Sequence, residues 1–160
     1  ADAPDILVNN AGYFAVESLE QTSPESFART LGVNLAAPFL FARALVPGMK
    51  TRRNGHLVTI GSIADHVPFP GNSAYAASKY GVRGLHEVLR TELRGTGVRA
   101  TLISPGPVDT ALWSPANRAA RRDTPAPERM LDVQAVAEAV LYAVSQPPTV
   151  NVDELRLSRS

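Results

Sequence analysis

The sequence predicts an α/β protein in which a parallel β-sheet lies between two layers of helices. Short apolar runs alternate with long amphipathic segments along its 160 residues, in the order βαβαβαβ. Strands that are joined through helices run parallel, with right-handed crossovers. Three of the expected strands are followed by runs rich in small polar residues, "NNAG", "GSIAD" and "SPGPVDT". Because ligands of open parallel sheets bind beyond the carboxyl ends of the strands, these runs are expected to form a site.

Two strands and one helix are expected in the first part of the chain. "DILVNN", residues 5–10, is a short apolar run that ends in a turn signal. A long, largely buried helix is expected over residues 24–53, because Ser23 suits an N-cap and Pro24 suits the first helical position. "HLVTIG", residues 56–61, combines β-branched and apolar residues and predicts the second strand.

The same alternation continues to the end of the chain. Residues 73–95 carry valine and leucine at helical spacing and predict a second helix, and "VRATLIS", residues 98–104, predicts a third strand. Residues 107–131 are rich in proline and arginine and are expected to form a loop. A third helix is expected over residues 132–146, and "VNVDELRL", residues 150–157, is the last candidate strand.

The composition is that of an ordinary soluble domain. Apolar residues make up 44% and charged residues 19%, with a net charge of +1, so nothing argues for a nucleic-acid partner. The chain has no cysteine and its three histidines lack metal-ligand spacing, so neither disulfides nor a metal site is expected. No apolar run approaches the length of a membrane span and no signal peptide is visible. The expected location is therefore cytoplasmic, without a membrane partner.

Tyr75 and Lys79 lie four residues apart in "SAYAASKYG" and would share one face of the second helix. A neighbouring ammonium group favours the phenolate, so it would lower the tyrosine pKa from about 10 towards neutrality. Ser62 follows the second strand, 13 residues before Tyr75, and could converge with it on one carbonyl oxygen. Taken singly, these residues equally fit an exposed tyrosine beside a solvated lysine, and a serine that caps the chain after a strand.

The chain resembles the short-chain dehydrogenase/reductase family in five elements that occur in the family's order from residue 5 to about residue 110. They are "NNAG", Asn34 in the following helix, Ser62 in "IGS", the tyrosine and lysine of "YAASK", and "SPGPVDT". The resemblance implies a Rossmann-like, three-layer fold that is truncated to about its last four strands. Residues 1–160 would then be a single, partial oxidoreductase domain.

The resemblance also implies roles for these residues. Tyr75 would be the general acid in reduction and the base in alcohol oxidation, and Ser62 would hydrogen-bond the substrate oxygen. Lys79 would lower the pKa of Tyr75 and hold the nicotinamide ribose, and Asn34 would help to hold a water linked to Lys79. The implied cofactor is NAD or NADP, and its expected contacts are Asn9, Ala11, Gly12, Tyr75, Lys79, Pro105, Gly106, Val108 and Thr110.

Pro38 gives Asn34 a further property. A proline has no N–H, so the helical hydrogen bond to the Asn34 carbonyl cannot form, which should bend the helix and leave that carbonyl free to accept a water. The alternative is a tolerated kink beside an ordinary polar residue.

One part of the family pattern is missing. Members normally begin with a strand, a glycine-rich phosphate loop and a helix, and we find no such segment here. "GTGVRA", residues 95–100, fits the glycine spacing but follows a helix and leads into a strand, so it is interpreted as a turn. The sequence therefore does not choose between NAD and NADP, and one edge of the 5–10 strand should be uncovered.

Three explanations of the missing half remain open. It was cleaved, it is disordered, or it was never encoded and the short chain is not catalytic. The abrupt start at Ala1 favours cleavage or truncation.

The predicted function is an NAD(P)-dependent oxidoreductase that interconverts a small carbonyl compound and a secondary alcohol. The alternative is a catalytically silent assembly module, and in either case a homo-oligomer is expected through the helices near 24–53 and 73–95. Leu112, Trp113 and Met130 could line an apolar substrate pocket below the 107–131 loop. A hydrolase triad of Ser62, Asp65 and His66 is conceivable but lacks the G-x-S-x-G turn that a nucleophile elbow requires.

Overall fold

The sheet has the predicted parallel arrangement. The structure is a computed structural model that describes residues 4–113, 115–120 and 125–160. Within this part of the chain, the strands β1 (Ile6–Asn9), β2 (Gly55–Ile60), β3 (Val98–Pro105) and β4 (Glu154–Leu157) form one sheet in the order β1-β2-β3-β4. Every neighbouring pair is parallel. The α/β fold class is thereby confirmed.

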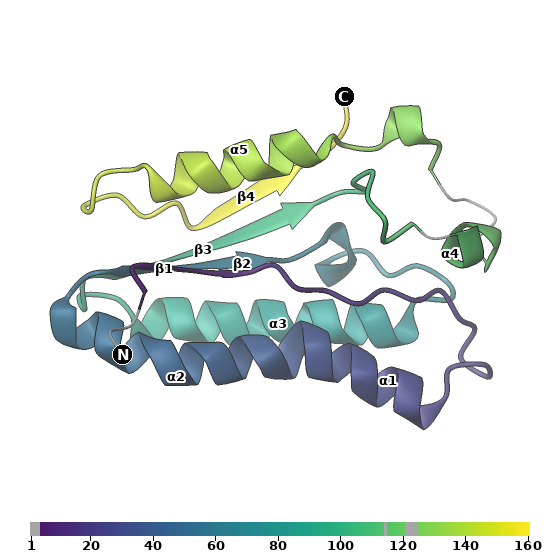
Figure 1. The fold of residues 1–160 in the computed structure, drawn as a ribbon, viewed down its shortest axis with the longest axis horizontal. Helices are drawn as coiled ribbons and strands as arrows, with labels where there is room; N and C mark the ends of the chain where they lie inside the picture. The colour runs from purple at the N-terminus through teal and green to yellow at the C-terminus, as the bar shows by residue number, and fades with distance from the viewer. Residues whose placement is uncertain (1–3, 114, 121–124) are drawn as a thin grey trace.

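The helices form the two outer layers (Figure 1). One face of the sheet is covered by α1 (Pro24–Leu31), α2 (Ala37–Arg52) and α3 (Ser73–Glu92), and the other by α5 (Val133–Val144). The apolar side chains of β2 and β3 alternate between these layers, as successive residues of a strand must. Leu57 belongs to the cluster of buried residues with α2 and Val58 to the cluster with α5, and the two side chains are no more than 1% exposed.

The long first helix is interrupted where Pro38 predicts an irregularity. Ser23 caps α1, since its Oγ accepts a hydrogen bond of 3.0 Å from the Ser26 N–H. Between α1 and α2, Gly32–Ala36 forms a π-helical turn, in which the Ala37 N–H donates to the carbonyl of Gly32. The irregularity is therefore a π turn between two α-helical segments. Such turns are frequent at functional sites.

The helical stretch Pro24–Arg52 is also long and apolar enough to cross a membrane, judged by length and composition alone. The sequence predicts no apolar run of that length, because isolated charged residues such as Arg43 interrupt the apolar residues of this stretch. The core helices of many proteins pass the same test. Here α2 packs against β2, and α1 packs against α3.

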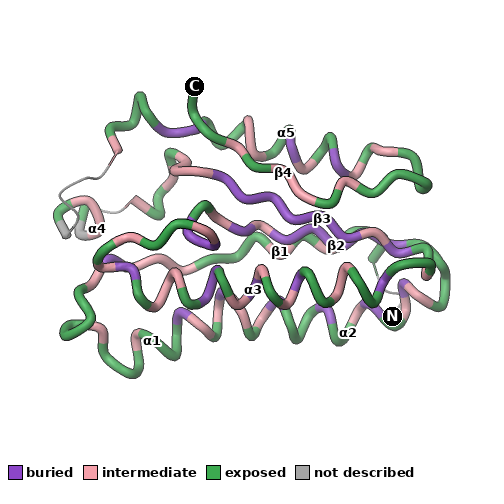
Figure 2. Tube along the Cα trace, turned by 180° about the vertical axis from the view of Figure 1, so that it is seen from behind, coloured by how far each residue is buried: buried purple, intermediate pink, exposed green. Residues whose placement is uncertain are grey.

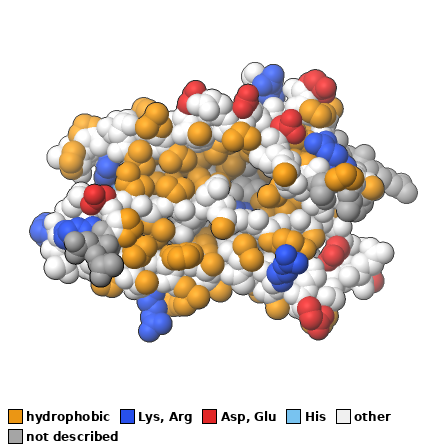
Figure 3. Space-filling view, in the orientation of Figure 1, with side chains coloured by type: hydrophobic (Ala, Val, Ile, Leu, Met, Phe, Trp, Pro, Cys, Tyr) orange, Lys and Arg blue, Asp and Glu red, His pale blue; other side chains and the backbone are white. Residues whose placement is uncertain are grey.

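Strand β1 lies at the edge of the sheet and has the expected uncovered surface. Its Ile6 and Val8 side chains are 45% and 42% exposed, whereas Ile103 at the centre of β3 is fully buried. Figure 2 shows burial concentrated along β2 and β3. Figure 3 shows hydrophobic side chains gathered on the surface between the α2 and α5 layers. An apolar edge strand of this kind favours pairing or cover by further polypeptide.

Two element predictions need correction. The 107–131 segment is not wholly a loop, because it contains α4 (Pro115–Ala120) and a 3₁₀ turn at Pro127–Arg129, and each of these begins at a proline, which suits the first turn of a helix. The last strand begins at Glu154 rather than at residue 150.

The prediction that "GTGVRA" is a turn is confirmed. Gly95 and Gly97 adopt φ angles of +75° and +84°, which favour glycine. A Cβ at Gly97 would also lie 2.3 Å from the carbonyl oxygen of Arg53. The glycines therefore let two backbone segments approach closely.

Candidate active site

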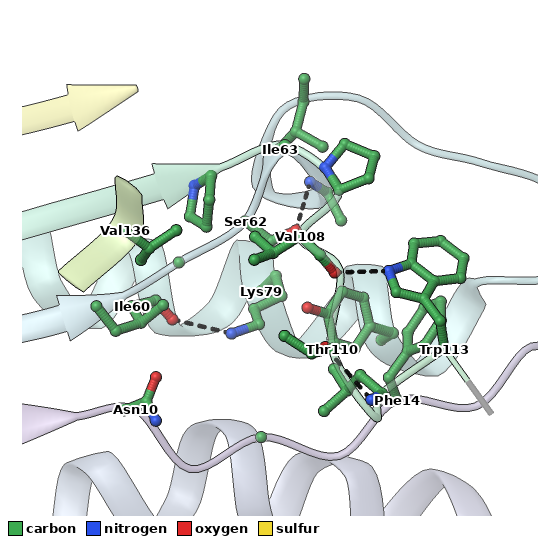
Figure 4. A pocket seen from close by; sticks show the side chains of 18 of the residues that line it. Asn10, Phe14, Ile60, Ser62, Ile63, Lys79, Val108, Thr110, Trp113 and Val136 are labelled. Atoms are coloured by element: carbon green, nitrogen blue, oxygen red, sulfur yellow. Dashed lines mark hydrogen bonds between the residues drawn. The ribbon is translucent and has the colours of Figure 1, made fainter. Parts of the chain in front are cut away.

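A cavity of about 810 Å³ opens at the carboxyl ends of β1, β2 and β3. Its lining comes from the loops that follow these strands, from the start of α3 and from α5 (Figure 4). Ser62, Tyr75 and Lys79 all line it, so the structure brings together the three residues that the sequence singled out. This is the edge at which a parallel sheet is expected to bind its ligands.

Ser62 combines a structural role with a place in the site. It follows β2 in an extended conformation and caps the 3₁₀ turn Ile63–Asp65, accepting a hydrogen bond of 3.1 Å from the Ala64 N–H at its Oγ. Its hydroxyl also lies close enough to the phenol of Tyr75 to act on its pKa. Capping is therefore compatible with a substrate contact, because the cap fixes the direction of the Ser62 hydroxyl.

Tyr75 and Lys79 lie one turn apart on α3, and the Lys79 ammonium lies 5.6 Å from the centre of the Tyr75 ring. The lysine is only 6% exposed, and its Nζ donates a hydrogen bond of 2.9 Å to the carbonyl oxygen of Ile60 at the end of β2. This bond directs the ammonium group towards the end of β2, in the wall of the cavity (Figure 4).

The pKa values of this pair differ from the expectation. Burial raises the pKa of Tyr75 to about 12, opposed by the hydrogen bond from Ser62 and reinforced by the negative charge of Asp65. Burial also lowers the pKa of Lys79 to about 8, against the opposing effect of Asp65. The predicted lowering of the tyrosine pKa is therefore wrong for this structure, because desolvation and the charge of Asp65 together outweigh the effect of Ser62 on the phenol. Tyr75 is a protonated donor at neutral pH.

Asn34 lies behind the cavity rather than in its lining. The side chain is 2% exposed and its Oδ1 accepts a hydrogen bond of 2.7 Å from the Tyr13 N–H. Its Nδ2 donates to the carbonyl of Tyr13 and to the Ser78 hydroxyl, both at 2.9 Å. Asn34 thus joins the loop after β1 to α3, next to the catalytic candidates. No signal in the sequence identified these partners.

The expected cofactor contacts separate into two groups. Gly12, Pro105, Gly106, Val108 and Thr110 line the main cavity together with Tyr75 and Lys79. Asn9 and Ala11 line a smaller hollow against the first helix instead, while Asn10 and Phe14 line the main cavity and were missed. The alternation of side chains along a strand could have identified Asn10, because neighbours point to opposite faces. Nothing in the sequence identified Phe14.

The 107–131 segment contributes two of its three predicted lining residues. Leu112 and Trp113 line the cavity. Met130 does not, because it follows the 3₁₀ turn Pro127–Arg129, where its N–H bonds the carbonyl of Pro127, and its side chain is 2% exposed within the protein.

The arrangement does not form a hydrolase triad. Nδ1 of His66 lies 2.6 Å from Asp65 Oδ1, but the other ring nitrogen lies near Glu154, at 3.6 Å. The Ser62 hydroxyl contacts Tyr75 and the Ala64 N–H rather than this histidine. In the described part of the chain, no group of three histidine, aspartate or glutamate residues is placed to hold a metal ion.

The cavity has the donors and the room for a nicotinamide nucleotide. An ammonium group carries three N–H donors, and among the described residues the Ile60 carbonyl is the hydrogen-bond acceptor found for Lys79. The remaining donors are available to the hydroxyl groups of a ribose. Gly12 and Gly106 leave the backbone accessible on two sides of the cavity.

The sequence matches known proteins over most of its length. Residues 3–121 match the family described as short chain dehydrogenase. An uncharacterized oxidoreductase of Staphylococcus aureus is 36% identical over 151 residues, which cover 94% of this chain and 62% of that protein. The chain thus spans less than two thirds of that relative's length.

Solved structures give the same result. A closed form of serine dehydrogenase complexed with NADP+ is 34% identical, with a TM-score of 0.82 over 95% of this chain and 63% of that one. A 4-hydroxyisoleucine dehydrogenase complexed with NADH is 26% identical, with a TM-score of 0.80 over 98% of this chain and 69% of that one.

Proposed function

The chain belongs to the short-chain dehydrogenase family, and on this premise we propose that it interconverts a small carbonyl compound and a secondary alcohol with NAD or NADP. One observation carries the proposal. The side chains of Ser62 and Tyr75 line one cavity with Lys79, whose ammonium lies 5.6 Å from the centre of the Tyr75 ring. Two adjacent hydroxyls can hold one carbonyl oxygen, and an ammonium beside them stabilises negative charge that develops there.

In this proposal the side chains bind the substrate and move its proton. A bound nicotinamide would supply the hydride, which no side chain can provide. Ser62 and Tyr75 donate hydrogen bonds to the carbonyl oxygen. Tyr75 then transfers its phenolic proton to that oxygen during reduction, and its pKa of about 12 keeps the proton in place at neutral pH until the oxygen becomes basic. In alcohol oxidation the same oxygen returns its proton to Tyr75.

Lys79 and Asn34 support this chemistry in different ways. The pKa of Lys79, lowered to about 8 by burial, lies close enough to neutrality for the ammonium to pass a proton on towards Tyr75. Its remaining N–H donors would hold the nicotinamide ribose. Asn34 fixes the loop after β1 against α3, and a water that it helps to hold would continue the proton path from Lys79.

The choice between NAD and NADP stays open in the proposal, since one solved relative was complexed with NADP+ and the other with NADH. The single partial domain, the cytoplasmic location and the homo-oligomer also stay predictions. The exposed Phe39 and Phe41 on α2 support an oligomer that buries this helix.

Tyr75→Phe tests the proposal in the full-length protein. We expect turnover of a panel of ketones with NADH and NADPH to fall by about 10²–10⁴-fold, the usual contribution of one acid–base group. Tyr80→Phe is the matched control, because Tyr80 lies on the same helix and is 47% exposed. Both variants should keep the melting temperature of the parent. Unchanged turnover in Tyr75→Phe would refute the role of this tyrosine.

The silent assembly module remains the second candidate, supported by the exposed apolar residues of α2 and β1. The two functions are separated by a reductase assay with the same ketone panel and a measured mass of the purified protein. An oligomer without hydride transfer to any ketone favours the module.

A further inference from the structure

The cavity has one end that is built from aromatic rings. Phe14 packs edge-on against Tyr75, with ring centres 4.8 Å apart at an interplanar angle of 75°. Trp113 packs in the same way against Phe14, at 5.4 Å and 67°. We call these three rings the aromatic wall. Figure 4 shows Phe14 and Trp113 together at one end of the cavity and Ser62 between them and Val136, so the wall lies beside the hydroxyls that would hold the reacting oxygen.

The aromatic wall is held in place by polar groups that are themselves satisfied. The indole N–H of Trp113 donates a hydrogen bond of 3.0 Å to the Val108 carbonyl, so the ring offers a ligand only its apolar surface. Asn117 on α4 fixes the other side of the wall. Its Nδ2 donates to the Phe14 carbonyl at 3.1 Å, and its Oδ1 accepts from the Val16 N–H at 3.2 Å. The wall is therefore ordered before a ligand arrives, which reduces the entropy cost of binding.

The described lining of the cavity offers few positively charged groups to an anionic ligand. Among the described residues that line it, Lys79 carries the one positive charge, and its ammonium is bonded to the Ile60 carbonyl at the end of β2. Arg118 bonds the Trp113 carbonyl with its Nε and lies 3.6 Å from Asp109 with its Nη2. Among the described residues that line the cavity, none offers a substrate carboxylate at the aromatic wall a dedicated counter-charge, and burying a carboxylate without one is costly.

We propose that the substrate is an uncharged ketone or secondary alcohol whose flat apolar group, typically an aryl group, lies against the aromatic wall. This inference rests on the proposed function, because Ser62 and Tyr75 define where the reacting oxygen lies. Aromatic pairs that pack edge to face or offset gain stability beyond that expected from the area they bury. Small hydroxy acids are expected to be poorer substrates than neutral aryl compounds.

A pair of matched ketones tests the charge requirement in the full-length protein. Acetophenone and phenylglyoxylate differ only in that a carboxylate replaces the methyl group. With NADH and with NADPH, we expect kcat/KM for acetophenone to exceed that for phenylglyoxylate by about tenfold or more, as for a buried charge without a partner. Equal values, or a preference for phenylglyoxylate, would overturn the proposal.

Variants of Trp113 test the aromatic wall. Trp113→Ala should raise KM for acetophenone by about tenfold with little change in kcat, because it removes a contact made equally in the ground and transition states. Trp113→Phe should restore KM to within about threefold. Leu141→Ala is the control, since Leu141 lies on α5 and is 63% exposed. If Trp113→Ala leaves KM unchanged, no substrate group lies against this ring.

A binding measurement separates the two proposals. The Trp113 part of the fluorescence, obtained by subtracting the spectrum of Trp113→Phe, should change on titration with 1-phenylethanol and change much less with mandelate, its carboxylate analogue. Binding of 1-phenylethanol without hydride transfer to any ketone would refute the proposed function and leave this inference standing. Tighter binding of mandelate, or no binding of either alcohol, would refute the inference whatever the turnover.

Discussion

Helix α3 places two ionisable side chains against β2, Lys79 near its start and His86 two turns further on. Both are buried, at 6% and 2% exposure, and each makes a hydrogen bond of 2.9 Å to β2, Lys79 to the Ile60 carbonyl and His86 to the Thr59 hydroxyl. Burial lowers both pKa values, to about 8 for the lysine and about 4 for the histidine. The two positions are therefore alike in burial, in the direction of the pKa shift and in having a hydrogen-bond partner on β2.

Lys79 and His86 differ in whether they reach the cavity at the carboxyl end of β2. Lys79 lies where β2 ends, so it reaches the cavity with Ser62 and Tyr75, whereas His86 lies within the packed layer and does not line the cavity. A buried, perturbed ionisable group is therefore not enough to identify a site. Its position at the carboxyl end of a strand, with room for a ligand, makes the difference.

The largest expected effect comes from replacing Lys79. Lys79→Met should lower kcat by about 10²–10³-fold, because the charge that stabilises the developing oxyanion is lost. The free energy of unfolding should not fall, since the change removes the cost of burying an ammonium. Steady-state kinetics and urea unfolding measure the two effects. Lys50→Met, the control on α2, should leave kcat unchanged. If Lys79→Met keeps full activity, Lys79 is no more catalytic than His86, and the contrast between the two positions is wrong.

At the second position the effects should be reversed. His86→Ala should lower the free energy of unfolding by about 2–4 kcal/mol, because it leaves a cavity and an unpaired Thr59 hydroxyl. The kcat of the folded protein should be unchanged. Val88→Ala is the matched control on the same helix, with a side chain that is 56% exposed, and should cost less than about 0.5 kcal/mol. A large loss of kcat in His86→Ala would show that the two positions are coupled.

Acid should destabilise the protein through its buried histidines. Burial lowers the pKa of His56, as of His86, to about 4 from 6.5, so between these values the unfolded chain binds more protons than the folded protein. Stability is then fully present above about pH 6.5 and is lost as the pH falls towards 4, by up to about 1.4 kcal/mol per pH unit for each histidine. Unfolding measured across this window should show a smaller slope in His86→Gln. If the free energy of unfolding depends on pH equally in His86→Gln and the parent protein, His86 does not have the lowered pKa described here.

The smallest expected effect is a change in the free energy of unfolding at alkaline pH, caused by the titration of Lys79. Its pKa is lowered to about 8 from 10.5, so the unfolded chain again binds more protons between these values. Stability should therefore increase as the pH rises from about 8 to 10, by at most about 1.4 kcal/mol per pH unit. Lys79→Met should remove this increase, and Lys50→Met should retain it. Urea midpoints at pH 8, 9 and 10 are the measurement.

Local patterns in the sequence carried most of the fold. The alternation of apolar runs and helical segments predicted the parallel sheet, and Ser23 and Pro24 located the start of α1. These features depend on residues that are close in sequence, so they can be predicted without the tertiary structure. Helix α4 was missed because its six residues carry too little periodic pattern to stand out from a proline-rich loop.

The site was predicted less completely than the fold. Ser62, Tyr75 and Lys79 are recognisable because their spacing places them at one strand end and on one helix face. Phe14 and the role of Asn117 were not recognisable, since the two residues are more than 100 positions apart and meet only when the loops after β1 and β3 pack together.

The sequence by itself determined the family, the order of strands and helices, and the chemical types at the carboxyl edge of the sheet. The tertiary structure alone decided the pKa values of Tyr75 and Lys79, the hydrogen bonds that Asn34 makes to Tyr13 and Ser78, and the aromatic end of the cavity. Burial and long-range packing are responsible for this division. A side chain's solvation and its distant neighbours are set by how the layers close over it, and no local pattern encodes that closure.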